Sequence, residues 1–123
     1  MEDRKDLDIL TVTTTVGSLP AAQKLAREIV KRRLAACVQL SHVHSYYHWQ
    51  GQLSEDPEVE LTLKTVPDNI DALQQLFHEQ HPYDVPQFAS WPCQSSAGYA
   101  DWVRAEVIPG GLEPSASAPA PLR

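Results

Sequence analysis

The residues of this chain best suited to chemistry are three histidines separated by even numbers of residues, His42, His44 and His48. In a regular strand successive side chains alternate between faces, so all three would project to one face, with Tyr46 between them. Residues two apart in a strand lie about 6.6 Å apart, and their imidazoles can converge on one divalent metal ion. His42 and His44 are therefore a candidate metal pair. The alternative is that they are surface or hydrogen-bonded histidines of a hairpin, because no third protein ligand is visible nearby.

A second candidate metal ligand is His81, in the segment His81-Pro82-Tyr83. The proline fixes the local backbone and so holds His81 in place at the end of an expected helix. The helix dipole favours a protonated ring at this end, so the alternative role for His81 is that of a helix cap.

Signals for catalysis are weak. The chain contains no Gly-rich phosphate loop, no His-Glu-x-x-His and no Gly-x-Ser-x-Gly, and Ser18 has no evident base beside it. Cys37 is expected to pack as a small core residue and Cys93 to be more exposed, and neither has an activating base next to it in the sequence. We therefore expect that the chain is not an enzyme.

Composition limits the partners and the compartment. The 123 residues carry a net charge of -6, which argues against nucleic-acid binding because that affinity depends on clustered cations. The one basic cluster, Lys31-Arg32-Arg33, is interpreted as a solvated helix face. The two cysteines form no Cys-x-x-Cys pair, Met1 to Asp8 lacks an apolar signal core, and no apolar run approaches the roughly 20 residues that span a bilayer. We expect a soluble cytoplasmic protein with no membrane partner.

Hydrophobic patterning in the first half of the chain predicts the elements that position the histidines. Leu7 to Thr15 is rich in Ile, Val and Thr and predicts a strand. Apolar residues at intervals of three and four then predict a helix with one apolar stripe: Ala22, Leu25, Ala26, Ile29, Val30 and Leu34. Ala35 to Trp49 and the alternating segment Val59 to Thr65 predict a long antiparallel hairpin. Its turn is expected at Gln50 to Gln52, with an irregularity around Ser54 to Pro57.

The second half of the chain predicts three shorter elements. Pro67-Asp68 opens a helix that ends before Pro82, since proline disfavours the helical conformation in the residue preceding it. Val85 to Pro92 is expected to be a short strand, and its prolines confine it to an edge. Tyr99 and Trp102 indicate a final short helix.

The order strand, helix, hairpin, helix, strand predicts an α+β fold of the ferredoxin-like βαββαβ type, with a long central hairpin and a short C-terminal helix. Residues 7–107 form the expected domain, between an N-terminal tail at 1–6 and a flexible Pro/Ala-rich tail at 108–123, whose composition buries too little apolar surface to repay its ordering entropy. Two helices on one face leave the other face of the sheet uncovered, so we expect self-association.

Several segments together resemble the CutA family, the divalent-cation tolerance proteins: Leu34-Ala35-Ala36-Cys37-Val38, Tyr47-x-Trp49-x-Gly51, Glu58-Val59 followed by Lys64-Thr65, His81-Pro82-Tyr83-x-x-Pro86, and Tyr99-x-x-Trp102. They occur in order between about Leu7 and Val107. The resemblance implies a ferredoxin-like subunit in a tight, PII-like homotrimer. It also implies an association with copper and other divalent cations and no established enzymatic activity.

The resemblance also implies particular site residues. Copper binding in bacterial members has been linked to a cysteine and a His-His pair, at positions that here hold Thr14, Gln80 and His81. Positions that usually carry charged side chains in the family here hold the amides Gln50, Gln52 and Gln87. The residues that still match are expected to line a pocket between subunits: Tyr47, Trp49, Lys64, His81 and Tyr83.

These observations leave three functions open. The first is a trimeric protein of divalent-cation tolerance that binds copper or another divalent cation. The second is a PII-like sensor that binds a small organic anion or nucleotide at the subunit clefts, with Lys64 as the cation. The third is a structural or scaffolding trimer without catalytic activity.

Overall fold

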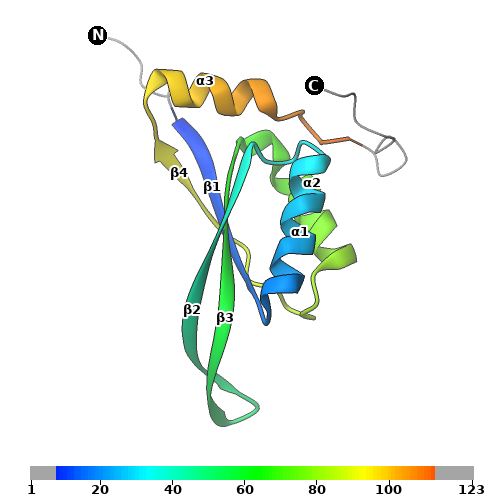
Figure 1. The fold of residues 1–123 in the computed structure, drawn as a ribbon, viewed down its shortest axis with the longest axis vertical. Coiled ribbons are helices and arrows are strands. Elements are labelled where there is room, and N and C mark those ends of the chain that lie inside the picture. The colour runs from blue at the N-terminus through cyan, green and yellow to red at the C-terminus, as the bar shows by residue number, and fades with distance from the viewer. Residues whose placement is uncertain (1–7, 113–123) are drawn as a thin grey trace.

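The computed structural model describes residues 8–112 as a four-stranded antiparallel sheet with helices. The elements in chain order are β1 (Asp8–Val16), α1 (Leu19–Lys31), β2 (Cys37–Trp49), β3 (Gln52–Thr65), the 3-10 helix η2 (Pro67–Asn69), α2 (Ile70–Gln80), β4 (Ala89–Gln94) and α3 (Ala97–Glu106). The strand order is β2-β3-β1-β4, which is the ferredoxin-like arrangement predicted from the sequence (Figure 1). None of the helices described is long and apolar enough to cross a membrane.

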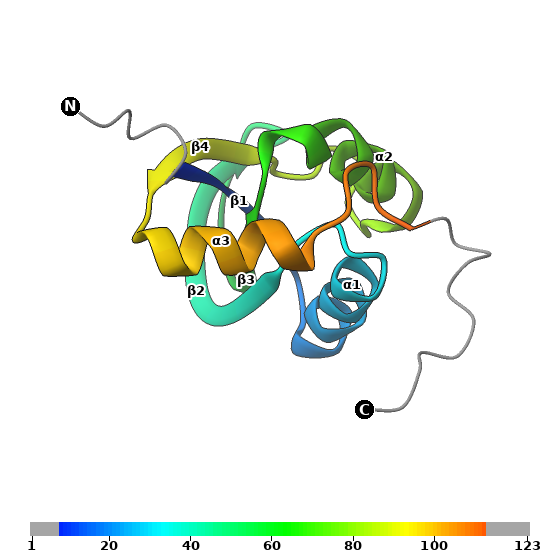
Figure 2. The same cartoon turned by 90° about the horizontal axis from the view of Figure 1, so that it is seen from above.

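One face of the sheet is covered by α1 and α2, which lie side by side (Figures 1 and 2). Alternate residues of the strands point into this layer and meet the apolar stripes of the two helices, as strand and helix periodicities require. The core is made of these side chains, each at most 3% exposed: Val12, Val16, Leu25, Ile29, Leu61, Leu63, Leu73, Leu76 and Phe77. Ser18 caps α1, since its Oγ accepts from the backbone N–H of Ala21 at 3.3 Å.

The other face of the sheet is largely uncovered, and we call it the open face. The helix α3 crosses only one end of the sheet (Figure 2), where Ile9, Ala100 and Val103 form a second small cluster. By register and alternation, the open face carries the side chains of Thr13, Thr15, Gln39, Ser41, Glu60, Thr62, Lys64 and Trp91. Polar and aromatic groups therefore share a surface that no helix of the described chain shields.

The hairpin of β2 and β3 is longer and more regular than expected. Its ladder runs without a break from Cys37 opposite Lys64 to Trp49 opposite Gln52, so the predicted irregularity at Ser54 to Pro57 is wrong. Pro57 is tolerated because β1 pairs with β3 only as far as Val59, so beyond that point β3 has a free side where the missing N–H is not needed. Gln50 and Gly51 have φ values of 51° and 77°, as a two-residue hairpin turn requires.

The last strand begins later than predicted. Its ladder with β1 runs over Ala89–Gln94 rather than Val85–Pro92, because residues 82–88 form the loop that carries the chain from α2 to the edge of the sheet. Gln87 fastens this loop by donating from Nε2 to Thr13 Oγ1 at 3.0 Å. The predicted edge position of the strand is confirmed.

Residues 108–112, which the sequence assigned to a flexible tail, are held against the domain, and we call them the C-terminal strap. The N–H groups of Ile108 and Leu112 donate to the carbonyls of Arg33 and Arg32 at 3.0 and 2.7 Å, so the folded domain continues to Leu112. The predicted tail segments 1–6 and 113–123 lie outside the described residues.

The basic cluster at the end of α1 is not a uniformly solvated face. Lys31 and Arg33 are exposed as predicted, but Arg32 is only 8% exposed. It stands at the C-cap of α1, where its Nε donates to Glu28 Oε1 at 2.7 Å and a second nitrogen lies 3.9 Å from Glu79. Glu28 is four residues before Arg32, a spacing that places two side chains side by side on a helix, so Arg32 lies along α1 instead of in water.

Candidate functional site

A hollow of about 720 Å³ lies where the hairpin meets the loop before β4, and we call it the hairpin groove. The strands supply Thr15, Ser45, Tyr46, Tyr47, Trp49 and Glu58, and the loop supplies Pro82, Tyr83, Asp84, Val85 and Gln87. Most of these strand residues belong to the open face, so the groove opens on the side away from α1 and α2. Its size is within the range of small-molecule sites in proteins.

Two tyrosines of the groove donate hydrogen bonds to carboxylates. Tyr83 Oη donates to Glu58 Oε2 at 2.6 Å, and Tyr47 Oη donates to Asp56 Oδ2 at 2.5 Å. Burial, followed by the bond to Glu58, raises the pKa of Tyr83 far above its usual value, and the bond to Asp56 raises the pKa of Tyr47. Both side chains therefore remain phenols at neutral pH, and the hydrogen bonds fix the orientation of their rings.

His81 lies behind the groove with both ring nitrogens engaged. Nδ1 accepts from the backbone N–H of Tyr83 at 3.1 Å, which assigns the ring proton to Nε2, and Nε2 donates to Thr14 Oγ1 at 2.9 Å. The ring also contacts the aromatic rings of Phe77 and Tyr83, with centroids 5.5 and 5.3 Å away. Thr14 and His81 thus meet, but a metal ion could reach the ring only by displacing one of these hydrogen bonds.

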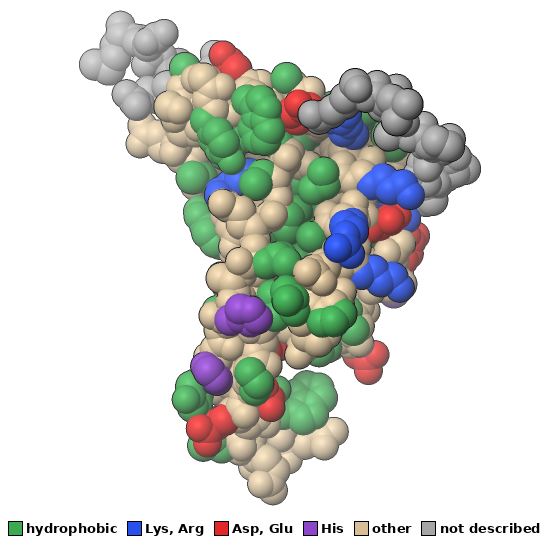
Figure 3. All heavy atoms as spheres, in the orientation of Figure 1, with side chains coloured by type: hydrophobic (Ala, Val, Ile, Leu, Met, Phe, Trp, Pro, Cys, Tyr) green, Lys and Arg blue, Asp and Glu red, His purple; other side chains and the backbone are tan. Residues whose placement is uncertain are grey.

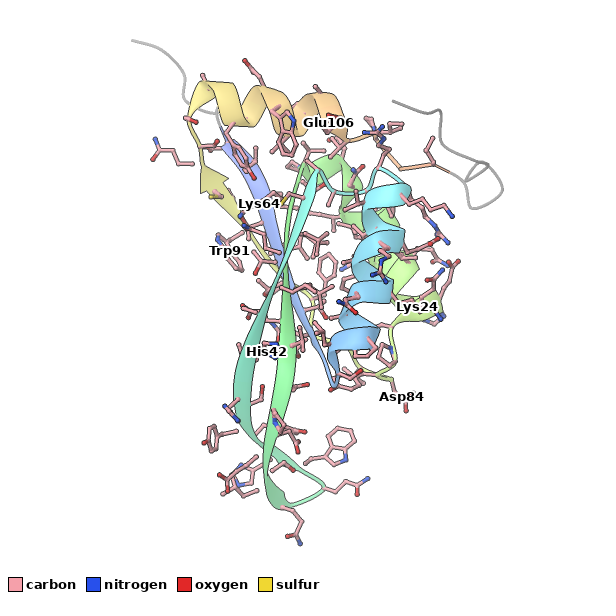
Figure 4. All side chains as sticks on the ribbon, in the orientation of Figure 1. Lys24, His42, Lys64, Asp84, Trp91 and Glu106 are labelled. Atoms are coloured by element: carbon pink, nitrogen blue, oxygen red, sulfur yellow. The ribbon has the colours of Figure 1, made fainter. Side chains whose placement is uncertain are left out.

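The histidines of β2 keep the predicted alternation. His42 lies opposite Val59 and His44 opposite Pro57 in an unbroken ladder, so they point to the same side, and both are exposed. Figure 4 labels His42 on β2, and Figure 3 shows histidine side chains at the surface of the hairpin. Within residues 8–112, no group of three or more His, Cys, Asp or Glu side chains could hold a metal ion. In one subunit the pair therefore offers two nitrogens and leaves the remaining positions of a metal to water or to another molecule.

Lys64 does not join the aromatic residues of the groove within one subunit. It lies beside Thr11 on the sheet, and Thr11 is in turn paired with Trp91 (Figure 4). Its Nζ donates to Gln39 Oε1 at 3.3 Å. The structure thus brings Tyr47, Trp49 and Tyr83 together around the groove and leaves Lys64 elsewhere on the open face.

The amide positions are also dispersed. Gln50 and Gln52 are exposed around the hairpin turn, Gln80 is exposed at the end of α2, and among these amides Gln87 is the one that lines the groove. Sequence reasoning did not identify Glu58 as a site residue, although it is only 9% exposed and accepts from Tyr83. No local signal marks the pair, since the two residues are 25 positions apart and meet only because the loop crosses the end of the sheet.

Comparison with known proteins identifies the family. Residues 10–106 match the family model described as CutA1 divalent ion tolerance protein. The chain belongs to this family. It is 33% identical over 109 residues to the divalent-cation tolerance protein CutA of Pectobacterium atrosepticum, covering 87% of this chain and 99% of that relative. It is 39% identical over 90 residues to a CutA homologue of Xenopus laevis, covering 72% of this chain and 59% of the longer frog protein.

Solved structures of the CutA family have the same fold. CutA of Synechococcus elongatus superimposes with a TM-score of 0.79 at 37% identity, covering 83% of this chain and 92% of that one. A protein of a Nostoc species, described as the PII-like protein CutA in apo form, gives a TM-score of 0.76 at 31% identity, covering 81% and 98%. The predicted family and its PII-like fold are thus confirmed.

Proposed function

We propose that this member of the divalent-cation tolerance family works as a non-catalytic homotrimer in the cytoplasm, in which copies of the subunit cover one another's open faces. The observation that carries the proposal is that the open face of one subunit is largely exposed to solvent. Trp91 is 46% exposed on it, and the described helices cover it only at the end crossed by α3. Large exposed apolar groups on a sheet face are a common mark of an interface.

Two further features support assembly. Thr11 is 3% exposed, and its Oγ1 has no hydrogen-bond partner within the described chain, so a neighbouring molecule could supply one. The outer part of the hairpin, beyond the pairing with β1, also exposes Tyr46, Trp49 and Leu53 by 67%, 59% and 64%. A second copy seated there would remove apolar surface from water and cover the free strand edges.

Light scattering on the purified protein tests the assembly. We expect the mass of a trimer for the wild type and a smaller species for Trp91→Arg, which places a charge on the open face. Val30→Arg is the matched control, because Val30 is 41% exposed but lies on α1, away from this face. A wild type that is a compact monomer in dilute solution would contradict the proposal, as would equal dissociation of the two variants.

For metal binding we propose His42 and His44 as the first site to test, with copper as the first ion. Both imidazoles are exposed and on one side of the strand, whereas the ring nitrogens of His81 are engaged. Calorimetry with Cu²⁺ is expected to show weaker binding for His42→Ala and unchanged binding for His81→Ala and for the exposed control His78→Ala. Equal affinity for Cu²⁺ in His42→Ala and wild type would exclude the histidine pair as the metal site. A loss of affinity confined to His81→Ala would assign the site to His81.

A second candidate function is that of a PII-like small-molecule sensor, and the volume of the hairpin groove favours it. The anion-binding form of this idea places Lys64 at a cleft between subunits, and within one subunit Lys64 does not line the groove. A thermal-shift survey with small metabolites tests whether any ligand stabilises the protein, and absence of a shift throughout would count against a sensor and leave a scaffolding role.

A further inference from the structure

The outward side of α1 concentrates positive charge in a chain whose net charge is -6 (Figure 3). Lys24, Arg27 and Lys31 are spaced by three and four residues, so they lie along one side of the helix, and all three are exposed. Leu25 and Ile29 bury the opposite side of α1 against the sheet. We call Lys24, Arg27 and Lys31 the basic stripe; Figure 4 labels Lys24 on α1.

The basic stripe is not neutralised within the subunit. None of its side chains forms an ion pair with an Asp or Glu of the described chain. The other Lys and Arg side chains of residues 8–112 each have a partner: Arg32 has Glu28, Arg33 has Glu106, Lys64 has Gln39 and Arg104 has Asp101. Because α1 covers the side of the sheet opposite the open face, an assembly through the open faces leaves the basic stripe on its outer surface (Figures 1 and 2).

An apolar stripe runs beside the basic stripe on the same helix. Leu19 and Val30 are 39% and 41% exposed, and Ala26, which is partly buried, lies on the same line of the helix surface. From Lys24 to Lys31 the basic stripe is about 10 Å long, or two helical turns. A complementary surface therefore carries negative charges in one line and apolar groups in the next, at the spacing of a helix.

We propose that the outward side of α1 docks an acidic amphipathic helix of another protein. The carboxylates of that helix, also spaced by three and four residues, pair with the basic stripe, and its apolar side chains cover Leu19 and Val30. Helices packed side by side share this periodicity, so successive ion pairs form without distortion of either helix. The docking surface is separate from the subunit contact and from the histidine pair of β2.

The surroundings of the basic stripe disfavour broader anionic partners. Glu28 and Glu79, whose side chains are 25% and 46% exposed, line a hollow together with Lys24, so a nucleic-acid duplex laid across α1 would also meet carboxylates. A membrane-binding segment has roughly four to eight clustered cations, and α1 offers three, with no aromatic anchor. A narrow acidic helix senses mainly the stripe itself, because charges more than about 8 Å away are screened at physiological salt.

Fluorescence anisotropy with two labelled peptides tests the proposal on the full-length protein in its native assembly. The probe is a peptide of about 20 residues, long enough to be helical in water, with glutamates along one stripe and leucines along the next. A peptide of the same composition in scrambled order is its control. We expect the ordered peptide to bind at least about tenfold more tightly, because only it forms the three ion pairs and the apolar contact together.

Two variants of α1 test the two stripes separately. Arg27→Gln should weaken binding of the ordered peptide about two- to fivefold, the usual effect of losing one exposed ion pair. Val30→Gln should weaken it about threefold or more through loss of apolar contact. Arg33→Gln is the matched control for charge, because Arg33 is exposed but lies beyond the end of α1 and is paired with Glu106, and it should leave binding unchanged.

Equal losses in Arg27→Gln and Arg33→Gln would mean nonspecific attraction and overturn the proposal. Equal binding of the two peptides, or tighter binding of a DNA duplex or of phosphatidylserine vesicles than of the ordered peptide, would also overturn it. Light scattering should give Arg27→Gln the mass of the wild type, and a smaller species would assign the basic stripe to a contact between copies of this chain. A monomeric wild type that binds the ordered peptide would contradict only the trimer.

Discussion

The ring of His81 is buried as a neutral group, and this links the stability of the fold to pH. Burial lowers the pKa of His81 below its usual value, although a hydrogen bond with the Thr15 backbone and the nearby charge of Glu58 act in the opposite direction. In the unfolded chain the ring takes up a proton near its ordinary pKa of about 6.5. The unfolded state therefore binds more protons below that pH, and the contribution of His81 to stability falls as the pH falls.

This reasoning predicts the behaviour of His81→Gln, which removes the titration. Its free energy of unfolding should be lower than that of the wild type at pH 7.5, because the contacts with Thr14 and Tyr83 are lost. The difference should shrink as the pH is lowered through about 6.5, because only the wild type pays the cost of keeping His81 neutral. Urea unfolding at several pH values measures this. The exposed His78→Gln serves as control, and a parallel shift of both variants at every pH would contradict the argument.

Among the elements, the C-terminal strap shows most clearly how backbone geometry decides tolerance to substitution. Its two glycines, Gly110 and Gly111, have φ values of 77° and 73°, which other residues adopt only with strain. A Cβ on Gly110 would meet nothing within 4 Å, whereas one on Gly111 would lie 2.9 Å from Leu34 Cγ and 3.0 Å from the carbonyl oxygen of Arg32. Backbone strain is common to both positions, and crowding affects only the second.

We therefore expect Gly111→Ala to destabilise the protein more than Gly110→Ala. The difference should be about 1–3 kcal/mol, the usual cost of inserting a methyl group into a closely packed site. Urea unfolding of the two variants at equal protein concentration measures it. Identical values would show that the strap does not lie against Leu34 as described.

The elements also show what sequence patterns do and do not predict. Alternation in Val59 to Thr65 and the helical stripe through Leu25 and Ile29 predicted strand and helix correctly, because burial on one face is a local, periodic signal. Pro57 led to the wrong prediction of an irregularity in the hairpin, because a strand tolerates a proline where no third strand lies alongside it. The C-terminal strap was not predicted, because it is held by hydrogen bonds to the carbonyls of a turn far away in the sequence. Composition does not predict such long-range hydrogen bonds.

The residues of the candidate site could be predicted from the sequence only in part, because their contacts also join distant segments of the chain. Tyr47, Trp49 and Tyr83 were expected to line a pocket from the resemblance to the CutA family, and the structure brings them together. The partnership of Tyr83 with Glu58, and the distance of Lys64 from them, depend on where the loop before β4 crosses the sheet. The position of this loop is set by the topology of the fold and cannot be predicted from a local stretch of sequence.

At the scale of the whole molecule, the proposed assembly makes stability depend on concentration. If folding and association are coupled, mass action raises the melting temperature as the protein concentration rises. We expect scanning calorimetry over a hundredfold concentration range to show this increase for the wild type and a much smaller one for Trp91→Arg. A melting temperature independent of concentration in the wild type would indicate that the subunit is stable alone.

The outer hairpin has a practical consequence for anyone who wishes to isolate a single subunit. Beyond the point where β1 ends, β2 and β3 pair only with each other, so the outward edges of this ribbon carry unpaired backbone groups. Substitutions that only shorten apolar side chains at the contact would leave these strand edges unpaired. Such a subunit would be prone to edge-to-edge aggregation with other copies. A soluble monomeric subunit would instead need lysines or a proline on these strand edges, because both prevent edge-to-edge pairing with another copy.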